Sequence, residues 1–269
     1  MRMATIASGS SGNCTYIGTR DTHILIDAGI SLKRITEGLQ KLDLTPDEID
    51  AVFITHEHTD HISALPMIAK HFGLPVYATA GTAGGIRKAD TAGVIDPSCI
   101  HVLDCTEEIR VGDLTVRPFP IPHDAAEPVA YRVEKRSADR TKSVAVATDL
   151  GCYDDRILSM LTGLDAMVLE ANHDVRMLQV GPYPYKLKQR ILSDSGHLSN
   201  DMAGELLCRI LHDDLKAVLL GHLSDKNNLP ELAYETVRVE VELSPLPYHG
   251  DDFAIEVAPR YELSRIIEL

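Results

Sequence analysis

Short apolar runs separated by Gly, Asp and Pro recur along the chain, and each run has the length of a β-strand. Between some of them apolar residues return every three or four positions, as on one face of a helix. The pattern predicts nine strands, over residues 22–27, 51–55, 75–79, 114–121, 129–133, 143–148, 165–170, 216–220 and 253–257. It also predicts helices over 31–41, over 63–71, and over a segment that begins near Ser199 or Asn200 and ends near Leu211.

The sequence contains no internal repeat, no low-complexity tract and no linker rich in Pro, Gly or Ser. Its 269 residues are enough to bury a large core. We therefore expect a single domain of mixed strands and helices spanning residues 1–269.

Composition and charge exclude several classes of protein. Hydrophobic residues make up 44% and charged residues 25%, as in soluble globular domains. Acids outnumber bases by 40 to 26, and the resulting net charge of −14 argues against indiscriminate binding of phosphate backbones. The five cysteines are scattered without a CxxC pair, which excludes a thiolate zinc site of that pattern. With no signal-peptide pattern and no apolar run of membrane-span length, we expect a cytoplasmic protein without membrane contacts.

One stretch, FITHEHTDH at residues 53–61, concentrates three histidines and two acids directly after a predicted strand. Polar groups removed from water without partners cost several kcal/mol each, so these side chains need something to bind. Imidazole and carboxylate are ligands for zinc, manganese and iron. The motif therefore predicts a metal site built from His56, His58, Asp60 and His61.

Three more strand ends supply ligands of the same kind: His123 in PIPHD, Asp149 in VATD and His222 in LLGHLS. We expect two ions about 3.5 to 4 Å apart, as in two-metal hydrolytic sites. The first ion would bind His56, His58 and His123, the second would bind Asp60, His61 and His222, and Asp149 would bridge them. Asp27, which ends the run ILID, is expected either to orient a ligand histidine or to serve as a turn residue before Gly29.

The motifs ILIDAG, THEHTDH, PHD, ATD and GHLS, in this order, resemble those of metallo-β-lactamase-fold hydrolases. More narrowly, SGSSGNC (8–14), LEANHD (169–174), GPYPYKLKQRILSDSGHLSN (181–200) and GHLSDKNN (221–228) resemble the YycJ/WalJ subfamily. The resemblance covers residues 3–258 and leaves the last dozen residues without a match. It implies an α/β fold, a four-layer αββα sandwich, and a 5′-to-3′ DNA exonuclease. It favours manganese for activity, while zinc or iron would suit the same ligands.

The wider family also implies a proton donor. In RNase Z a histidine that is not a metal ligand lies in a GHS segment and is assisted by a glutamate in an EAT segment. His197 in SGHLSN and Glu170 in LEAN resemble this pair. A hydroxide held between the ions and oriented by Asp60 would attack phosphorus, and His197 would protonate the departing alkoxide. The alternative is that His197 merely caps the helix that begins near Ser199.

Residues 174–192 carry four bases and one acid, with Tyr183 and Tyr185 placed between them to stack on bases. Candidate substrate contacts are Lys186, Lys188 and Arg190 here, with His173 just before. Ser10, Ser11 and Asn13 of the Gly/Ser-rich loop are candidates for holding a terminal phosphate through backbone N–H groups. An ordinary solvated helix and an ordinary glycine-rich turn are the alternatives.

Three functions remain open at this point. The first is a nuclease acting on DNA that is single-stranded or has a free 5′ end, with RNA not excluded. The second is a small-molecule hydrolase of thioesters or lactones, similar to glyoxalase II, on the same ligands. The third is a protein on this scaffold that binds metal or nucleic acid without catalysis. The sequence leaves the oligomeric state undetermined.

Overall fold

A computed structural model describes residues 1–137 and 140–269, which divide into two compact units. The first unit comprises Met1–Pro120, Ala125–Lys142 and Pro259–Leu269, and the second comprises Ile121–Asp124 and Ser143–Ala258. Each unit is thus assembled from segments far apart in the sequence. The expectation of a single domain over residues 1–269 stays a prediction.

The first unit is built on a sheet with the strand order β14-β1-β2-β3-β4-β5-β6. Neighbours pair antiparallel from β14 to β3 and parallel from β3 to β6. The strands are β1 Arg2–Ala7, β2 Cys14–Gly18, β3 His23–Ile26, β4 Ala51–Phe53, β5 Val76–Thr79, β6 Ile100–Leu103 and β14 Ile267–Glu268. Because β3 and β4 are parallel, the loops that follow them, which carry the Asp27 and His56 motifs, lie at the same edge of the sheet.

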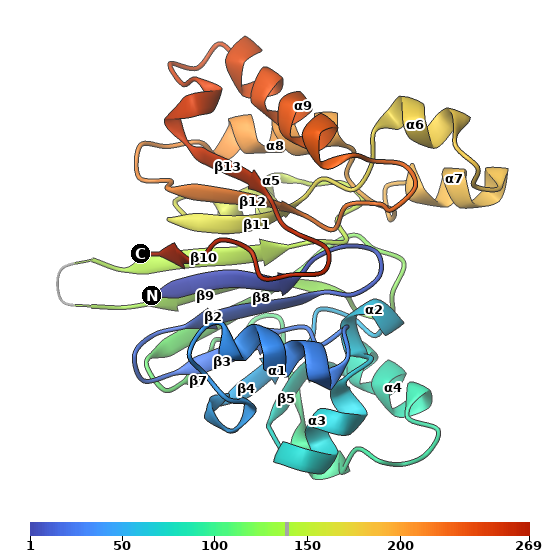
Figure 1. Cartoon of the computed structure of the whole chain (residues 1–269), viewed down its shortest axis with the longest axis vertical. Helices are drawn as coiled ribbons and strands as arrows, with labels where there is room; N and C mark the ends of the chain where they lie inside the picture. The colour runs from blue at the N-terminus through green and yellow to red at the C-terminus, as the bar shows by residue number, and fades with distance from the viewer. Residues whose placement is uncertain (138–139) are drawn as a thin grey trace. The chain divides into compact units, whose positions relative to one another are not determined.

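Helices and a three-stranded antiparallel ribbon complete the first unit. The helices are α1 Leu32–Gln40, α2 Thr59–Ile62, α3 Leu65–Phe72 and α4 Ala80–Ala89, and the ribbon strands are β7 Ile109–Val111, β8 Leu114–Pro120 and β9 Val129–Lys135. Helix α1 begins at Ser31, whose side chain accepts from the Arg34 N–H, and it lies across the sheet (Figure 1). Its residues Ile35 and Leu39 are buried in the core of this unit.

The second unit contains four parallel strands that run in the order β10-β11-β12-β13. They are β10 Lys142–Ala147, β11 Ala166–Glu170, β12 Ala217–Gly221 and β13 Ala254–Val257. The helices are α5 Asp155–Leu161, α6 Val175–Val180, α7 Tyr185–Ile191, α8 Asn200–Ile210 and α9 Pro230–Leu243. Figure 1 shows α8 beside α9, and α6 beside α7 away from the strands. The near-continuous apolar sequences VAVA, AMVL and AVLL are typical of parallel strands covered on both faces.

All nine predicted strands are present, with ends that differ by a few residues, and the three predicted helices correspond to α1, α3 and α8. The pattern missed the strands β1, β2, β6, β7 and β14 and the helices α2, α4 to α7 and α9. Helix α4 has the sequence AGTAGGIRKA, and its three glycines hide a helical periodicity.

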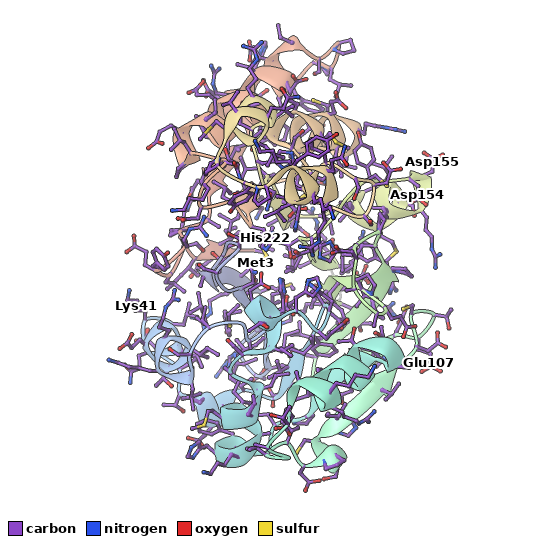
Figure 2. The ribbon with its side chains drawn as sticks, turned by 90° about the vertical axis from the view of Figure 1, so that its right-hand side faces the viewer. Met3, Lys41, Glu107, Asp154, Asp155 and His222 are labelled. Atoms are coloured by element: carbon purple, nitrogen blue, oxygen red, sulfur yellow. The ribbon has the colours of Figure 1, made fainter. Side chains whose placement is uncertain are left out.

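Polar residues of the second unit fall into two environments. Asp154 and Asp155, at the start of α5, are exposed, whereas His222 is buried among other side chains (Figure 2). Within residues 1–137 and 140–269, no helix combines the length and apolar character that crossing a membrane requires. The interior position of His222 is the first sign that its polarity serves a site.

Candidate metal centre

Three imidazoles gather in the first unit after β4. Asp60 and His61 lie within the short helix α2, whose N-cap residue is His58, rather than in a loop that precedes a helix. Nε2 of His56 lies 3.0 Å from Nδ1 of His58, and the ring centroids of His56 and His61 are 4.1 Å apart. Oδ2 of Asp60 lies 3.5 Å from Nε2 of His61. The first unit thus brings together the four predicted ligands of this motif.

This spacing fits a divalent metal ion. Two imidazole nitrogens bound to one ion at about 2.1 Å each lie about 3.0 to 3.4 Å apart, and the 3.0 Å between Nε2 of His56 and Nδ1 of His58 is at the lower end of this range. His56 and His61 are fully buried, so these polar rings are sheltered from water. Neutral imidazole nitrogens that converge in a buried place are the donor set that zinc, manganese or iron accepts.

Asp27 and Thr55 fix the orientation of His61. Oδ2 of Asp27 accepts a hydrogen bond from Nδ1 of His61 at 2.8 Å, so Nε2 would be the atom of His61 that binds a metal. Thr55 donates its backbone N–H to Oδ1 of Asp27 at 2.9 Å, and its hydroxyl lies 3.0 Å from Oδ2. Sequence reasoning did not select Thr55, although its place directly before His56 at the strand end was a usable signal.

Asn13 joins the Gly/Ser-rich loop to this motif. Its Nδ2 lies 3.1 Å from Nε2 of His61, its backbone N–H donates to the Asp60 carbonyl oxygen at 2.8 Å, and its Oδ1 accepts from the Gly9 N–H. A side chain on Gly29 would collide with the same Asp60 carbonyl oxygen, which explains the glycine in ILIDAG. Asn13 is buried and touches the ligand histidine, so its position favours a supporting role over direct contact with substrate.

In the second unit, three parallel strands deliver polar residues to one edge of the sheet. Asp149 follows β10, Glu170 ends β11 and His222 follows β12. Oδ1 of Asp149 lies 3.5 Å from Nε2 of His222 and 3.7 Å from Nε2 of His123. All three predicted ligands of this unit therefore point at one place.

The backbone at these strand ends is strained. Asp27, Asp149 and His222 have φ values of +62°, +59° and +55°. Residues with a Cβ enter this left-handed region at a cost of roughly 1–2 kcal/mol each. Asp43 is the other non-glycine residue with positive φ within the described parts of the chain. Strain gathered at site residues is typical of positions that function keeps in place.

His123 presents the correct nitrogen for a ligand. Its Nδ1 donates to the Gly196 carbonyl oxygen at 3.1 Å, which directs Nε2 toward Asp149. Burial lowers the pKa of His123, against the opposing effect of the Asp149 charge, and this favours the neutral ring that metals bind.

Glu170 is a fully buried carboxylate with four hydrogen bonds. Oε1 accepts from Nδ1 of His197 at 2.8 Å and from Nδ1 of His222 at 2.9 Å. Oε2 accepts from the backbone N–H groups of Leu150 and Leu198. Burial acts to raise the pKa of Glu170, but the charges and hydrogen bonds of the two histidines outweigh it and lower that pKa to about 2. Glu170 therefore orients two histidines.

His197 stands beside the ligands in a different role. The cap of α8 is Ser199, whose Oγ accepts from the Met202 N–H at 3.2 Å, so His197 does not cap this helix. With Nδ1 bound to Glu170, its Nε2 is the atom available for proton transfer. The side chain of His197 is 15% exposed, whereas that of His222 is only 2% exposed. This partial exposure suits a group that must reach a substrate.

Two predicted substrate contacts lie in unexpected surroundings. His173 is 1% exposed, both its ring nitrogens lack a partner among the described residues, and burial lowers its pKa to about 4. Its burial argues against contact with substrate. Arg190 forms a two-point ion pair with Asp124, with Nη2 2.8 Å from Oδ1, so this base fastens α7 to the residue after His123.

The remaining predicted contacts lie on the surface of their units. Lys186 is exposed on α7, and the half-buried Lys188 donates to the Gln179 carbonyl oxygen at 2.7 Å. Ser10 and Ser11 are exposed at the tip of the Gly/Ser-rich loop. These four residues keep the accessibility that a substrate contact requires.

Comparison with known proteins gives the family. A model described as the beta-lactamase superfamily domain matches residues 22–222. Exodeoxyribonuclease WalJ of Streptococcus pneumoniae serotype 2 is 39% identical over 236 residues, which cover 88% of this chain and 86% of that protein. Exodeoxyribonuclease YycJ of Bacillus anthracis is 36% identical over 237 residues, which cover 88% of each.

The fold agrees with these matches. Zn²⁺-bound PqqB from Methylobacterium extorquens superimposes with a TM-score of 0.71 at 16% identity, over 100% of both chains. The similarity confirms the α/β metallo-β-lactamase fold that the sequence motifs implied. With 39% identity to WalJ and 36% identity to YycJ over 88% of its residues, this chain belongs to the WalJ/YycJ family of the metallo-β-lactamase superfamily.

Proposed function

We propose that the protein is a metal-dependent exonuclease that degrades DNA from its 5′ end. The observation that carries the proposal is the hydrogen-bonded pair of His197 and Glu170 beside the ligands of the second unit. An alkoxide is a poor leaving group and benefits strongly from a positioned acid, whereas a thiolate leaves with little help. The relatives named exodeoxyribonuclease support the same activity.

Two divalent ions would be held by the residues that the sequence predicts. The proposed sets are His56, His58 and His123 for one ion and Asp60, His61 and His222 for the other, with Asp149 shared. When bound, the ions would lower the pKa of water to about 7 and offset charge on the phosphoryl oxygens. Manganese, zinc and iron(II) all suit these donors, and manganese is our choice for activity.

The chain's own residues supply the remaining steps. Asp60 orients the attacking water, which loses a proton to solvent as its oxygen forms the new bond to phosphorus. As the bond from phosphorus to the 3′ oxygen breaks, His197 gives its Nε2 proton to that oxygen. Glu170 keeps the ring in place through Nδ1 and compensates the charge of the imidazolium. The products are a 5′-mononucleotide and a shorter strand that again carries a 5′-phosphate.

The proposed substrate is single-stranded DNA, or duplex DNA with an accessible 5′ end. Lys186 and Lys188 on α7, with Tyr185, which is 73% exposed, offer cations and a stacking surface in a protein of net charge −14. RNA is the second nucleic acid to test, because the 2′-hydroxyl contacts that would distinguish it are not identified.

Removal and return of metal tests this function. Treatment with a chelator should abolish hydrolysis of single-stranded DNA, and added Mn²⁺ or Zn²⁺ should restore it, because the water nucleophile depends on the ions. The assay follows release of acid-soluble nucleotide from DNA and from RNA, with a thioester in parallel. Reloaded protein that turns over the thioester and leaves both nucleic acids intact would contradict the proposal and favour the small-molecule hydrolase.

A further inference from the structure

We infer that Arg260, together with the turn at Ser10 and Ser11, binds the 5′-phosphate of the DNA strand and makes the enzyme selective for 5′-phosphorylated ends. The inference rests on the proposed exonuclease function and names a specificity residue for it. Arg260 lies in the C-terminal segment, outside the part of the sequence that resembles the family motifs.

The turn contains two backbone N–H groups without an acceptor among the described residues. Gly12 donates its N–H to the Gly9 carbonyl oxygen at 2.9 Å, which closes a turn with Ser10 and Ser11 at its centre. Within the described residues, the N–H groups of these two serines have no acceptor, and both residues are exposed. Successive backbone N–H groups in a turn conformation form anion-binding concavities in other proteins.

Arg260 brings a positive charge to this turn. Its Nη1 lies 3.4 Å from Oγ of Ser10, although the two residues are 250 positions apart in sequence. The C-terminal segment is fixed beside the turn, because Ser8 donates its N–H to the Pro259 carbonyl oxygen and Arg34 donates to that of Arg260 at 3.2 Å. A guanidinium beside two amide donors is a suitable arrangement for a phosphate.

The turn is also tied to the metal motif of the same unit. Asn13 lies three residues after Ser10 and contacts Nε2 of His61 at 3.1 Å. Three residues span at most about 10 Å, and successive phosphates of a stacked strand lie about 3.4 Å apart along its axis. A 5′-phosphate held at Ser10 therefore leaves room for at most about three nucleotides before the His61 motif. An enzyme that removes short products from a strand end requires such a short spacing.

The chemistry of the proposed reaction makes this recognition repeatable. Each cleavage between phosphorus and the 3′ oxygen leaves the remaining strand with a new 5′-phosphate. The group recognised at the start of one cycle is thus regenerated for the next. A site for that phosphate would direct degradation from the 5′ end at every step.

The test compares DNA of one sequence with a 5′-phosphate or a 5′-hydroxyl. In wild-type protein we expect kcat/KM to be about 10- to 100-fold higher for the phosphorylated strand, the value of one hydrogen bond between charged groups. Arg260→Gln should lose this preference while its rate on 5′-hydroxyl DNA changes little, and Arg260→Lys should keep part of it. Arg265→Gln, an exposed arginine in the same segment, is the matched control and should behave as wild type.

A binding measurement separates this inference from the proposed function. The metal-loaded His197→Ala protein is titrated with each oligonucleotide, with and without Arg260→Gln, by fluorescence anisotropy. Tighter binding of the phosphorylated strand that depends on Arg260 supports the site even if the wild type cleaves no DNA, an outcome that would sink only the exonuclease proposal. Equal binding of both strands, or a preference that survives Arg260→Gln, overturns the inference whatever the activity.

Discussion

Asp149→Asn should lower kcat/KM on single-stranded DNA by about 10³-fold or more and reduce the amount of bound metal. Oδ1 of Asp149 lies within 3.7 Å of Nε2 of both His123 and His222, and we propose that it serves both ions. The amide keeps the shape of the side chain, but it removes the negative charge and turns a donor group toward the ions. Activity assays and elemental analysis of the purified protein provide the measurement.

Asp155→Asn is the matched control for this change. Asp155 lies in the same unit, its side chain is 97% exposed, and the substitution removes the same charge (Figure 2). The control should retain its metal and its rate. A full complement of metal together with normal hydrolysis in Asp149→Asn would show that the proposed ligand set is wrong.

His197→Ala should slow DNA hydrolysis by about 10²- to 10⁴-fold and leave the metal content unchanged, because we propose that the residue protonates the leaving group rather than binding an ion. Proton transfer from Nε2 of His197 takes place only in the transition state. The loss should therefore appear in kcat more than in KM. The comparison substrate is bis(p-nitrophenyl) phosphate, whose phenolate leaves without an acid. The variant should hydrolyse this ester at nearly the wild-type rate.

His249→Ala is the control for the loss of a histidine, since His249 is an exposed residue of the same unit that pairs with Glu242.

Glu170→Gln tests the residue that holds His197. The amide NH₂ of the new glutamine would face N–H groups that now donate to the Glu170 carboxylate. We therefore expect the free energy of unfolding to fall by about 1–3 kcal/mol. If His197→Ala slows DNA and the nitrophenyl ester equally, the residue has a role other than proton donation.

Much of the site could be predicted because its residues occupy a special place in the pattern. Asp27, Asp149 and His222 each come at the end of an apolar strand. The parallel strands of the second unit bring Asp149 and His222 to one edge of its sheet, and β3 and β4 do the same for Asp27 and the His56 motif in the first unit. The HxHxDH motif could also be recognised from local sequence, because its side chains come together within one short stretch of chain. The fold class followed from the resemblance of the motifs, in their order, to those of metallo-β-lactamase-fold hydrolases.

Other features depend on tertiary contacts that no local pattern reveals. Arg260 meets Ser10 across 250 residues, and Arg190 meets Asp124 across 66. His173 is of a residue type common in functional sites, yet packing buries it. Burial and long-range pairing are decided by how elements pack, so the sequence alone left Arg260 unnoticed and gave Arg190 and His173 roles that their surroundings do not favour.

The most direct test of the 5′-to-3′ exonuclease is a time course on two single-stranded DNAs, one labelled at the 5′ end and one at the 3′ end, with the metal-loaded protein. The structure and the family lead us to expect short labelled products at once from the 5′-labelled strand. The 3′-labelled strand should shorten stepwise while keeping its label. Early release of the 3′ label, cleavage at internal positions, or intact DNA in both reactions would contradict the proposed activity.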